Sequence, residues 1–170
     1  MKTILFSMVI ILFVSGISFS QDMKPKPISS PMLKTLEGTW ISDPYEFMGA
    51  KMTDEAVHKM ILNSQFLEVS IKSTGDNGFV YEGLGIIAPS EDGTFTGWFY
   101  DIYGKDGIMT YTGKVDNGKL IMTGSNNFMD EKREISIEDN KIVHNIVIEM
   151  KYPGADKTQQ KLTVTYKKRN

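Results

Sequence analysis

Two histidines, an aspartate and an arginine stand in stretches where apolar and polar residues alternate. Asp54 and His58 share the apolar face of one stretch. Arg133 lies on the apolar face of a second stretch, and His144 on that of a third. Such groups are costly to bury unless they are paired or hydrated. Facing inward, they would orient the polar end of a bound molecule, and Arg133 would grip a carboxylate. The alternative is structural, in which each of the four bonds a neighbouring residue or reaches solvent.

Motifs of well-known catalytic and metal sites are missing from the sequence. It has no phosphate-binding glycine loop, dinucleotide fingerprint, His-Glu-x-x-His or Gly-x-Ser-x-Gly. The 170 residues hold two histidines and no cysteine, which excludes disulfides and multi-histidine or thiolate metal sites within them. We therefore predict no catalytic residue, no metal ligand and no cofactor. A hydrolase-type enzyme with a histidine and a carboxylate as base is the least favoured alternative.

The net charge of the chain bears on whether it binds nucleic acid. Nineteen Lys and Arg residues face 21 Asp and Glu residues, for a net charge of −2. A nearly balanced chain has no basic excess to hold phosphates, so we expect no nucleic-acid partner. With 41% hydrophobic and 24% charged residues, the composition is that of a globular protein of one domain.

The N-terminal residues 1–20 predict a secretory signal peptide. Lys2 precedes an apolar run at 4–14, and small residues lead to a cleavage site after Ser20. We expect export to the periplasm or beyond. The run is shorter than the roughly 20 residues that span a bilayer, so no stable membrane insertion is expected after cleavage. Residues 21–36 contain three prolines and predict a flexible linker that ends in a short helical turn.

From residue 37 to residue 170 the pattern has a period of two, which is typical of strands with one buried face. Turn signals such as Asn117-Gly118 separate the stretches, since Asn-Gly tolerates the positive φ angles of hairpin turns. The mixed charge run 130–134 is predicted to be a solvated turn. Ten strands are predicted, at 37–42, 50–62, 65–73, 79–88, 94–103, 108–115, 119–127, 132–138, 141–151 and 158–168.

Short connections between antiparallel strands favour a meander, and closing a long meander removes its exposed edges. The sequence therefore predicts an all-β fold, an up-and-down antiparallel β-barrel of about ten strands. Barrels wider than about eight strands leave interior space for a ligand. The fourth and fifth predicted strands, 79–88 and 94–103, are apolar on both faces, so the pattern does not orient them.

Alternation assigns the other strands an inward face rich in methionine, isoleucine and valine. Methionine is flexible and polarisable, so a cavity lined with it can adapt to an apolar guest. Plain filling of the core is the alternative. The interior candidates for ligand binding are Met52, His58, Met60, Met109, Tyr111, Arg133, His144 and Tyr166.

Several short segments occur in order across residues 36–168, among them Leu36-Glu37-Gly38-Thr39-Trp40, Ile108-Met109-Thr110-Tyr111-Thr112-Gly113 and Leu162-Thr163-Val164-Thr165-Tyr166-Lys167. Together they resemble an uncharacterised, lipocalin-like bacterial family, the domain of unknown function 1579. The resemblance implies a calycin-type barrel and brings no activity or ligand. Gly38-x-Trp40 also looks like the lipocalin motif whose ring plugs one barrel end.

These observations favour an exported, lipocalin-like barrel that binds a small apolar or amphipathic ligand in its interior, without catalysis. A protein-interaction module is the main alternative. It would use the aromatic residues Trp98 and Tyr100 of the fifth predicted strand as an exposed patch.

Overall fold

The structure is a computed structural model that describes residue 26 and residues 30–138, 140–151 and 159–169. The predicted signal peptide and half of the predicted linker, residues 21–25 and 27–29, lie outside the described residues, and so does the turn that the sequence Pro153-Gly154-Ala155-Asp156 predicts. Among the described residues, no helix has the length and apolar character needed to cross a membrane.

The described residues form one antiparallel sheet of 11 strands. The strands are β1 (Gly38–Ser42), β2 (Tyr45–Phe47), β3 (Ala50–Ile61), β4 (Phe66–Gly75), β5 (Val80–Pro89), β6 (Thr94–Asp101), β7 (Met109–Asp116), β8 (Lys119–Ser125), β9 (Met129–Glu138), β10 (Lys141–Met150) and β11 (Gln159–Lys168). A short 3₁₀ helix, Gly104–Asp106, follows β6. Ten of the strands match the ten that the sequence predicts, and β2 is additional.

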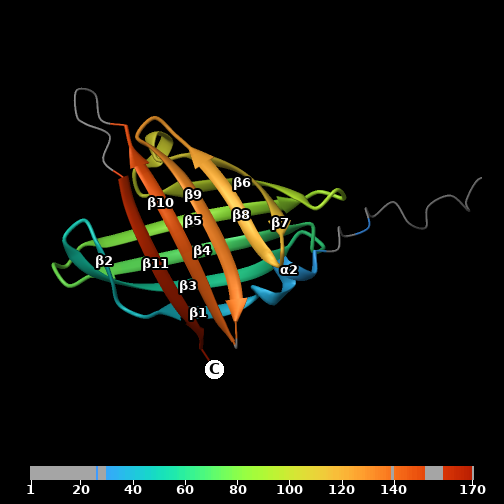
Figure 1. Cartoon of the computed structure of the whole chain (residues 1–170), viewed down its shortest axis with the longest axis horizontal. Coiled ribbons are helices and arrows are strands. Elements are labelled where there is room, and N and C mark those ends of the chain that lie inside the picture. Colours follow the sequence, from blue (N-terminus) through green and yellow to red (C-terminus); the bar gives the residue numbers. More distant parts are fainter. Residues whose placement is uncertain (1–25, 27–29, 139, 152–158, 170) are drawn as a thin grey trace, which may run out of the picture.

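Closure of the barrel depends on β1. This strand pairs with β11 on one side and with β3 on the other, so the sheet has no free edge there. The short β2 is an extra strand that pairs with the first residues of β3, at Ala50–Met52. The prediction of an all-β, closed antiparallel barrel of about ten strands is therefore confirmed. Figure 1 shows β8–β11 crossing β3–β5 at a steep angle, so that two walls of the barrel face each other.

One end of the barrel carries the helix α2 (Pro31–Thr35), as Figure 1 shows. The Ser30 hydroxyl accepts a hydrogen bond from the Leu33 backbone N–H at 3.4 Å and caps the helix. Leu33 and Leu36 are buried in the same core as Trp40. The indole Nε1 of Trp40 donates to the carbonyl oxygen of Leu36 at 2.7 Å, which ties the tryptophan to the segment that follows the helix.

The charge run 130–134 is not the solvated turn that we predicted, because it belongs to β9. Alternation along the strand separates its charges between the two faces. Glu131 is 6% exposed and Arg133 is half-buried, while Asp130 and Lys132 are exposed. The two inward charges neutralise each other, which is why a charged segment can form part of the barrel wall.

The structure also orients β6, which the sequence left open. Phe95 is buried, and Phe99 packs against the core, whereas Tyr100 is 43% exposed on the outer face. Phe99 needs a neighbour without a side chain. A Cβ atom on Gly83 would lie 2.2 Å from the ring, so glycine at this position makes room for the phenylalanine.

Candidate functional site

The barrel encloses a cavity of about 820 Å³. This volume falls within the roughly 300–1,000 Å³ that is typical of small-molecule sites. Most of the wall is apolar, and its aliphatic and thioether side chains include Met52, Leu67, Val69, Ile87, Met109, Met122, Ile142, Ile146 and Ile148. The fold is therefore compatible with binding a ligand in its interior.

Seven of the eight interior candidates named from the sequence line this cavity. They are Met52, His58, Met109, Tyr111, Arg133, His144 and Tyr166. The eighth, Met60, is half-buried near the end of β3 and packs against the core without lining the cavity. The cavity is also lined by Tyr45, Tyr81, Asp101 and Glu131, which were not among the candidates. The only signal for Glu131 was its spacing of two residues from Arg133.

Asp54 holds the first polar cluster of the cavity. Its carboxylate is 2% exposed and accepts the phenol O–H of Tyr166 at 2.6 Å and that of Tyr45 at 2.9 Å. Burial, reinforced by Asp54, raises the pKa of Tyr166 well above its usual 10 and also raises the pKa of Tyr45. Both phenols therefore stay protonated donors at neutral pH. The additional strand β2 supplies Tyr45 to this cluster.

Arg133 and Glu131 form a second cluster on the inward face of β9. The Nε and Nη2 atoms of Arg133 donate to the two carboxylate oxygens of Glu131 at 2.7 and 3.2 Å. Burial acts to lower the pKa of Arg133, but the charge and hydrogen bonds of Glu131, together with Tyr111 and Tyr166, keep this pKa above the usual value. Burial and then Glu131 raise the pKa of Tyr111. Because Glu131 already binds the guanidinium in a bidentate pair, a ligand carboxylate would have to compete with Glu131 for Arg133.

The two histidines adopt opposite tautomers. The Nη1 group of Arg133 lies 3.4 Å from Nδ1 of His144, and a guanidinium can only donate, so the His144 proton is on Nε2. Nδ1 of His58 lies 3.1 Å from the carbonyl oxygen of Leu36, which can only accept, so the His58 proton is on Nδ1. Burial lowers the pKa of His58 to about 4. Burial, and then the charge of Arg133, lower the pKa of His144 well below 6.5.

A third cluster surrounds Asp101, at the end of β6. Its carboxylate accepts the phenol O–H of Tyr81 at 3.1 Å and the backbone N–H of Tyr103 at 2.9 Å. The two tyrosine rings lie 6.5 Å apart, and burial followed by Asp101 raises the pKa of Tyr81. Four acidic residues, Asp54, Asp101, Asp106 and Glu131, thus line the cavity, and among the described lining residues Arg133 is the one arginine or lysine.

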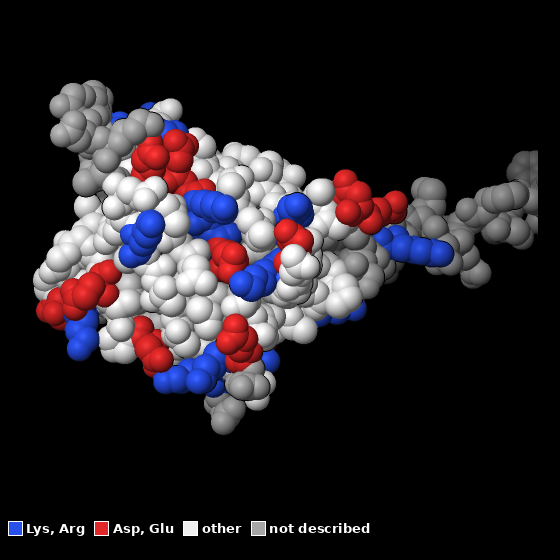
Figure 2. All heavy atoms as spheres, viewed as in Figure 1, with Lys and Arg blue, Asp and Glu red and all other residues white. Residues whose placement is uncertain are grey.

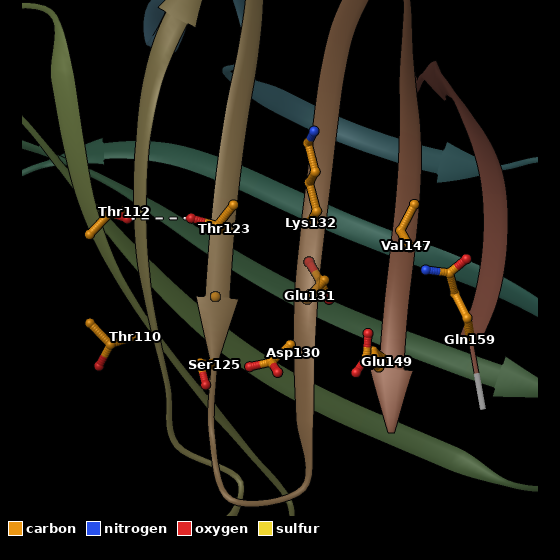
Figure 3. Close-up of a pocket in the computed structure, with 11 residues that line it drawn as sticks. Thr110, Thr112, Thr123, Ser125, Asp130, Glu131, Lys132, Val147, Glu149 and Gln159 are labelled. Carbon is orange, nitrogen blue, oxygen red and sulfur yellow. Dashed lines mark hydrogen bonds between the residues drawn. The ribbon is translucent and has the colours of Figure 1, made fainter. Parts of the chain in front are cut away.

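A second depression, of about 480 Å³, lies on the outer face of β7–β10 and is shown in Figure 3. Its polar side chains, such as those of Thr112 and Thr123, are exposed, and these two hydroxyls lie 3.4 Å apart. Asp130, at its edge, forms an ion pair of 2.6 Å with Lys151. These groups point away from the interior on the same strands whose alternate residues line the cavity, so the cavity is the stronger candidate site.

On the face shown in Figure 2, acidic and basic side chains lie close to one another among uncharged residues. Exposed pairs such as Lys72–Glu82 and Lys119–Glu134 fit this mixed pattern. The buried acidic residues Asp54 and Glu131, in contrast, line the cavity inside the barrel. No protein-family model matches the chain, and no curated protein matches it significantly.

Proposed function

We propose that this chain is an exported binding protein that holds a small apolar or amphipathic molecule inside its barrel. The observation that carries the proposal is the cavity of about 820 Å³, with its largely aliphatic and thioether wall. Transfer of an apolar molecule from water into such a space is favourable by roughly 25 cal/mol per Å² of apolar surface buried. Flexible methionine side chains let the wall adapt to the shape of the guest.

The polar groups of the cavity support binding in preference to catalysis. Three of the four carboxylates that line the cavity, those of Asp54, Asp101 and Glu131, already accept hydrogen bonds from phenols or from the guanidinium. A carboxylate held in this way orients its donors, and the bonded cluster gives the cavity a fixed polar region within an apolar wall.

Native mass spectrometry of the protein purified from its own host tests the proposal. We expect a retained, non-covalent mass that disappears on unfolding. Two adjacent substitutions in β3 provide a matched pair. Ala56→Phe fills the cavity, which Ala56 lines, whereas Val57→Phe adds the same ring at a side chain that is 40% exposed on the outer face. The retained mass should be lost from the first variant and kept in the second. Equal retention by both folded variants would contradict binding inside the barrel.

Export is part of the same proposal and is supported by the sequence of residues 1–20. The intact mass of the protein recovered from the host should correspond to a chain that begins at Gln21. Recovery of the uncleaved chain from the cytoplasm would contradict export without bearing on the cavity.

A second candidate function rests on the outer face of β5 and β6. Leu84 and Tyr100 are direct cross-strand partners and are 40% and 43% exposed, and Ile102 just beyond is 51% exposed. Such a patch is a candidate surface for contact with another protein. A partner recovered by affinity purification should be lost from a Tyr100→Ser variant of unchanged melting temperature. Retention of every partner by that variant would exclude this use of the patch.

A further inference from the structure

His144 carries a buried hydrogen-bond donor whose partner is not found among the described residues. Its side chain is 7% exposed and lines the cavity. Nδ1 accepts from Arg133 at 3.4 Å, while Nε2 has no partner in the part of the chain that the structure describes. Because a guanidinium cannot accept, Nε2 must carry the proton of the neutral ring. A buried N–H without an acceptor is unfavourable, so a group that accepts from it gains more than an ordinary hydrogen bond.

The tautomer restricts what can bind at Nε2 of His144. A metal ion needs the lone pair of a deprotonated ring nitrogen, and Nε2 of this tautomer presents a proton instead. The low pKa of His144 also keeps the ring neutral, so it offers no positive charge to an anion. The matching group on a ligand is therefore an uncharged hydrogen-bond acceptor.

The charges around the cavity disfavour anionic ligands. Asp54, Asp101 and Glu131 face the interior, and the charge of Arg133 is taken up by Glu131. A ligand carboxylate would have to displace Glu131 from a bidentate pair with bonds of 2.7 and 3.2 Å, and would leave that carboxylate buried and unpaired. An uncharged oxygen incurs neither cost.

We propose that the cavity selects uncharged, mainly apolar molecules whose carbonyl or ether oxygen accepts a hydrogen bond from Nε2 of His144, and that it rejects carboxylates of similar size. This specificity presupposes that the cavity binds a ligand, as proposed above. Nε2 is buried, so the oxygen reaches it when a lining side chain moves aside. Met109 and Met122 give the wall unbranched side chains with several rotatable bonds.

Three compounds of matched size test the selection. Butyrophenone carries a carbonyl acceptor, butylbenzene carries none, and 4-phenylbutyrate carries a negative charge. Each competes with the uncharged fluorophore N-phenyl-1-naphthylamine for the full chain. We expect butyrophenone to displace the fluorophore at a concentration about tenfold lower than either of the others, the effect of one hydrogen bond to a buried donor. Displacement of the fluorophore by butyrophenone and butylbenzene at the same concentration would overturn the proposal. This result is expected if a water molecule, and not the ligand, accepts the hydrogen bond from Nε2 of His144.

The outcomes separate the two proposals. If neither the fluorophore nor any of the three compounds binds, ligand binding itself fails. If the fluorophore and butylbenzene bind but butyrophenone has no advantage, or if 4-phenylbutyrate binds as well, the interior still binds apolar molecules and only the selection by His144 fails.

Two variants assign the effect to one nitrogen atom. His144→Phe keeps a ring of similar width and removes the donor, so it should abolish the advantage of butyrophenone over butylbenzene. His58→Phe is the matched control, because the proton of His58 already binds the Leu36 carbonyl and does not serve the ligand. The His58→Phe variant should preserve the advantage of butyrophenone over butylbenzene, even where it changes the affinity for both compounds. Loss of the advantage in His58→Phe alone would contradict the assignment.

A spectroscopic measurement on the unmodified protein makes the test independent of how the variants fold. Nitrogen-15 correlation spectra of imidazole rings distinguish the two neutral tautomers. We expect His144 to be protonated at Nε2 and His58 at Nδ1, and we expect the Nε2 proton of His144 to shift on addition of butyrophenone. Protonation of His144 at Nδ1, or an unchanged signal at saturating butyrophenone, would refute the proposal.

Discussion

Individual side chains in the barrel interior join strands that are far apart in the sequence. Asp54 in β3 accepts hydrogen bonds from Tyr45 in β2 and from Tyr166 in β11, which is 112 residues away. The cost of burying the carboxylate is offset because both phenols donate to it. These bonds link the first and last parts of the closed sheet and also define the polar region of the cavity.

Replacing Asp54 with asparagine should destabilise the fold. The asparagine oxygen can still accept, but the amide nitrogen cannot, so the phenol of Tyr45 or of Tyr166 loses its acceptor. We expect a loss of about 1–3 kcal/mol in the free energy of unfolding, measured by urea denaturation. Asp43→Asn is the control, since Asp43 pairs with Lys167 where both side chains are about half-exposed, and such pairs contribute at most about 1 kcal/mol. Equal losses in the two variants would show that the cluster is not stabilising.

The buried histidines should make stability depend on pH in a defined window. Burial lowers the pKa of His58 to about 4 in the folded chain, against an ordinary value of 6.5. As the pH falls below 6.5 the unfolded chain binds a proton that the folded chain refuses until about pH 4, so stability falls through this range. For His58 the total loss is on the order of 3 kcal/mol. His144 acts in the same direction.

The measurement is urea denaturation at a series of pH values between 7 and 4, for the protein and for His58→Asn. Asparagine offers an N–H to the Leu36 carbonyl and does not titrate. The variant should lose less stability across the window than the unmodified protein does. The same loss in both proteins would contradict a neutral, buried His58.

For individual residues, the sequence predicts which face of the sheet a side chain occupies better than it predicts the hydrogen-bond partner of that side chain. His58, Arg133 and His144 alternate with apolar residues, and that alone places them inside. Their partners depend on contacts across the barrel. Nothing local to Tyr166 indicates that it bonds Asp54, and for Arg133 the spacing of two residues from Glu131 is the one local sign of their pair. The expectation that Arg133 grips a ligand carboxylate follows from alternation alone, which does not show the bidentate pair with Glu131.

Among the elements, the five-residue strand β1 has the largest effect on the architecture, because it closes the sheet. It pairs with β11 through Trp40–Ser42 and with β3 through Gly38–Ile41. Trp40 is 2% exposed, and its indole bonds the Leu36 carbonyl, which also binds His58. The closing strand, the helix α2 and one wall of the cavity are thus joined at a single carbonyl group.

Substitution of Trp40 should weaken this closure. Trp40→Phe removes the indole N–H and part of the buried ring, and we expect it to lower the free energy of unfolding by about 1–3 kcal/mol. Trp40→Ala should cost about 3–5 kcal/mol. Urea denaturation followed by far-ultraviolet circular dichroism measures both. Trp98→Phe, at a half-buried position of β6, is the control and should cost less than Trp40→Phe. A larger cost at Trp98 would contradict the role given to β1.

The two-residue period of the sequence predicts a strand well where one face of that strand is buried and the other is exposed. It fails where the two faces are alike or the strand is very short. In β3 the burial alternates residue by residue, so the period is plain. The three residues of β2 are too few to show a period, and the sequence missed that strand. In β5 and β6 both faces carry apolar side chains, so orientation follows only from the packing of Phe99 against Gly83. In β9, charges on both faces hide the start of the strand.

At the scale of the whole molecule, the described residues form a closed barrel with a hollow interior. The run of hairpins along the chain predicts closure, because an open meander of this length would leave two unpaired edges. The size of the hollow could not be predicted from the sequence. It depends on how far side chains from opposite walls interdigitate, and clusters such as Asp54 with its two tyrosines hold their members against the wall by hydrogen bonds.

The central claim is that an apolar guest enters this interior, and the methyl resonances of the methionines test it most directly. In protein labelled with carbon-13 at the methionine methyl groups, titration with N-phenyl-1-naphthylamine should shift Met52, Met109 and Met122, which line the cavity. Met32 and Met60, which pack against the core without lining the cavity, should change little. Saturable shifts of these three and of the other lining methionines, Met48, Met129 and Met150, with Met32 and Met60 little changed, are the predicted result. No shift of these three, or shifts of Met32 and Met60 alone, would contradict a ligand-binding barrel.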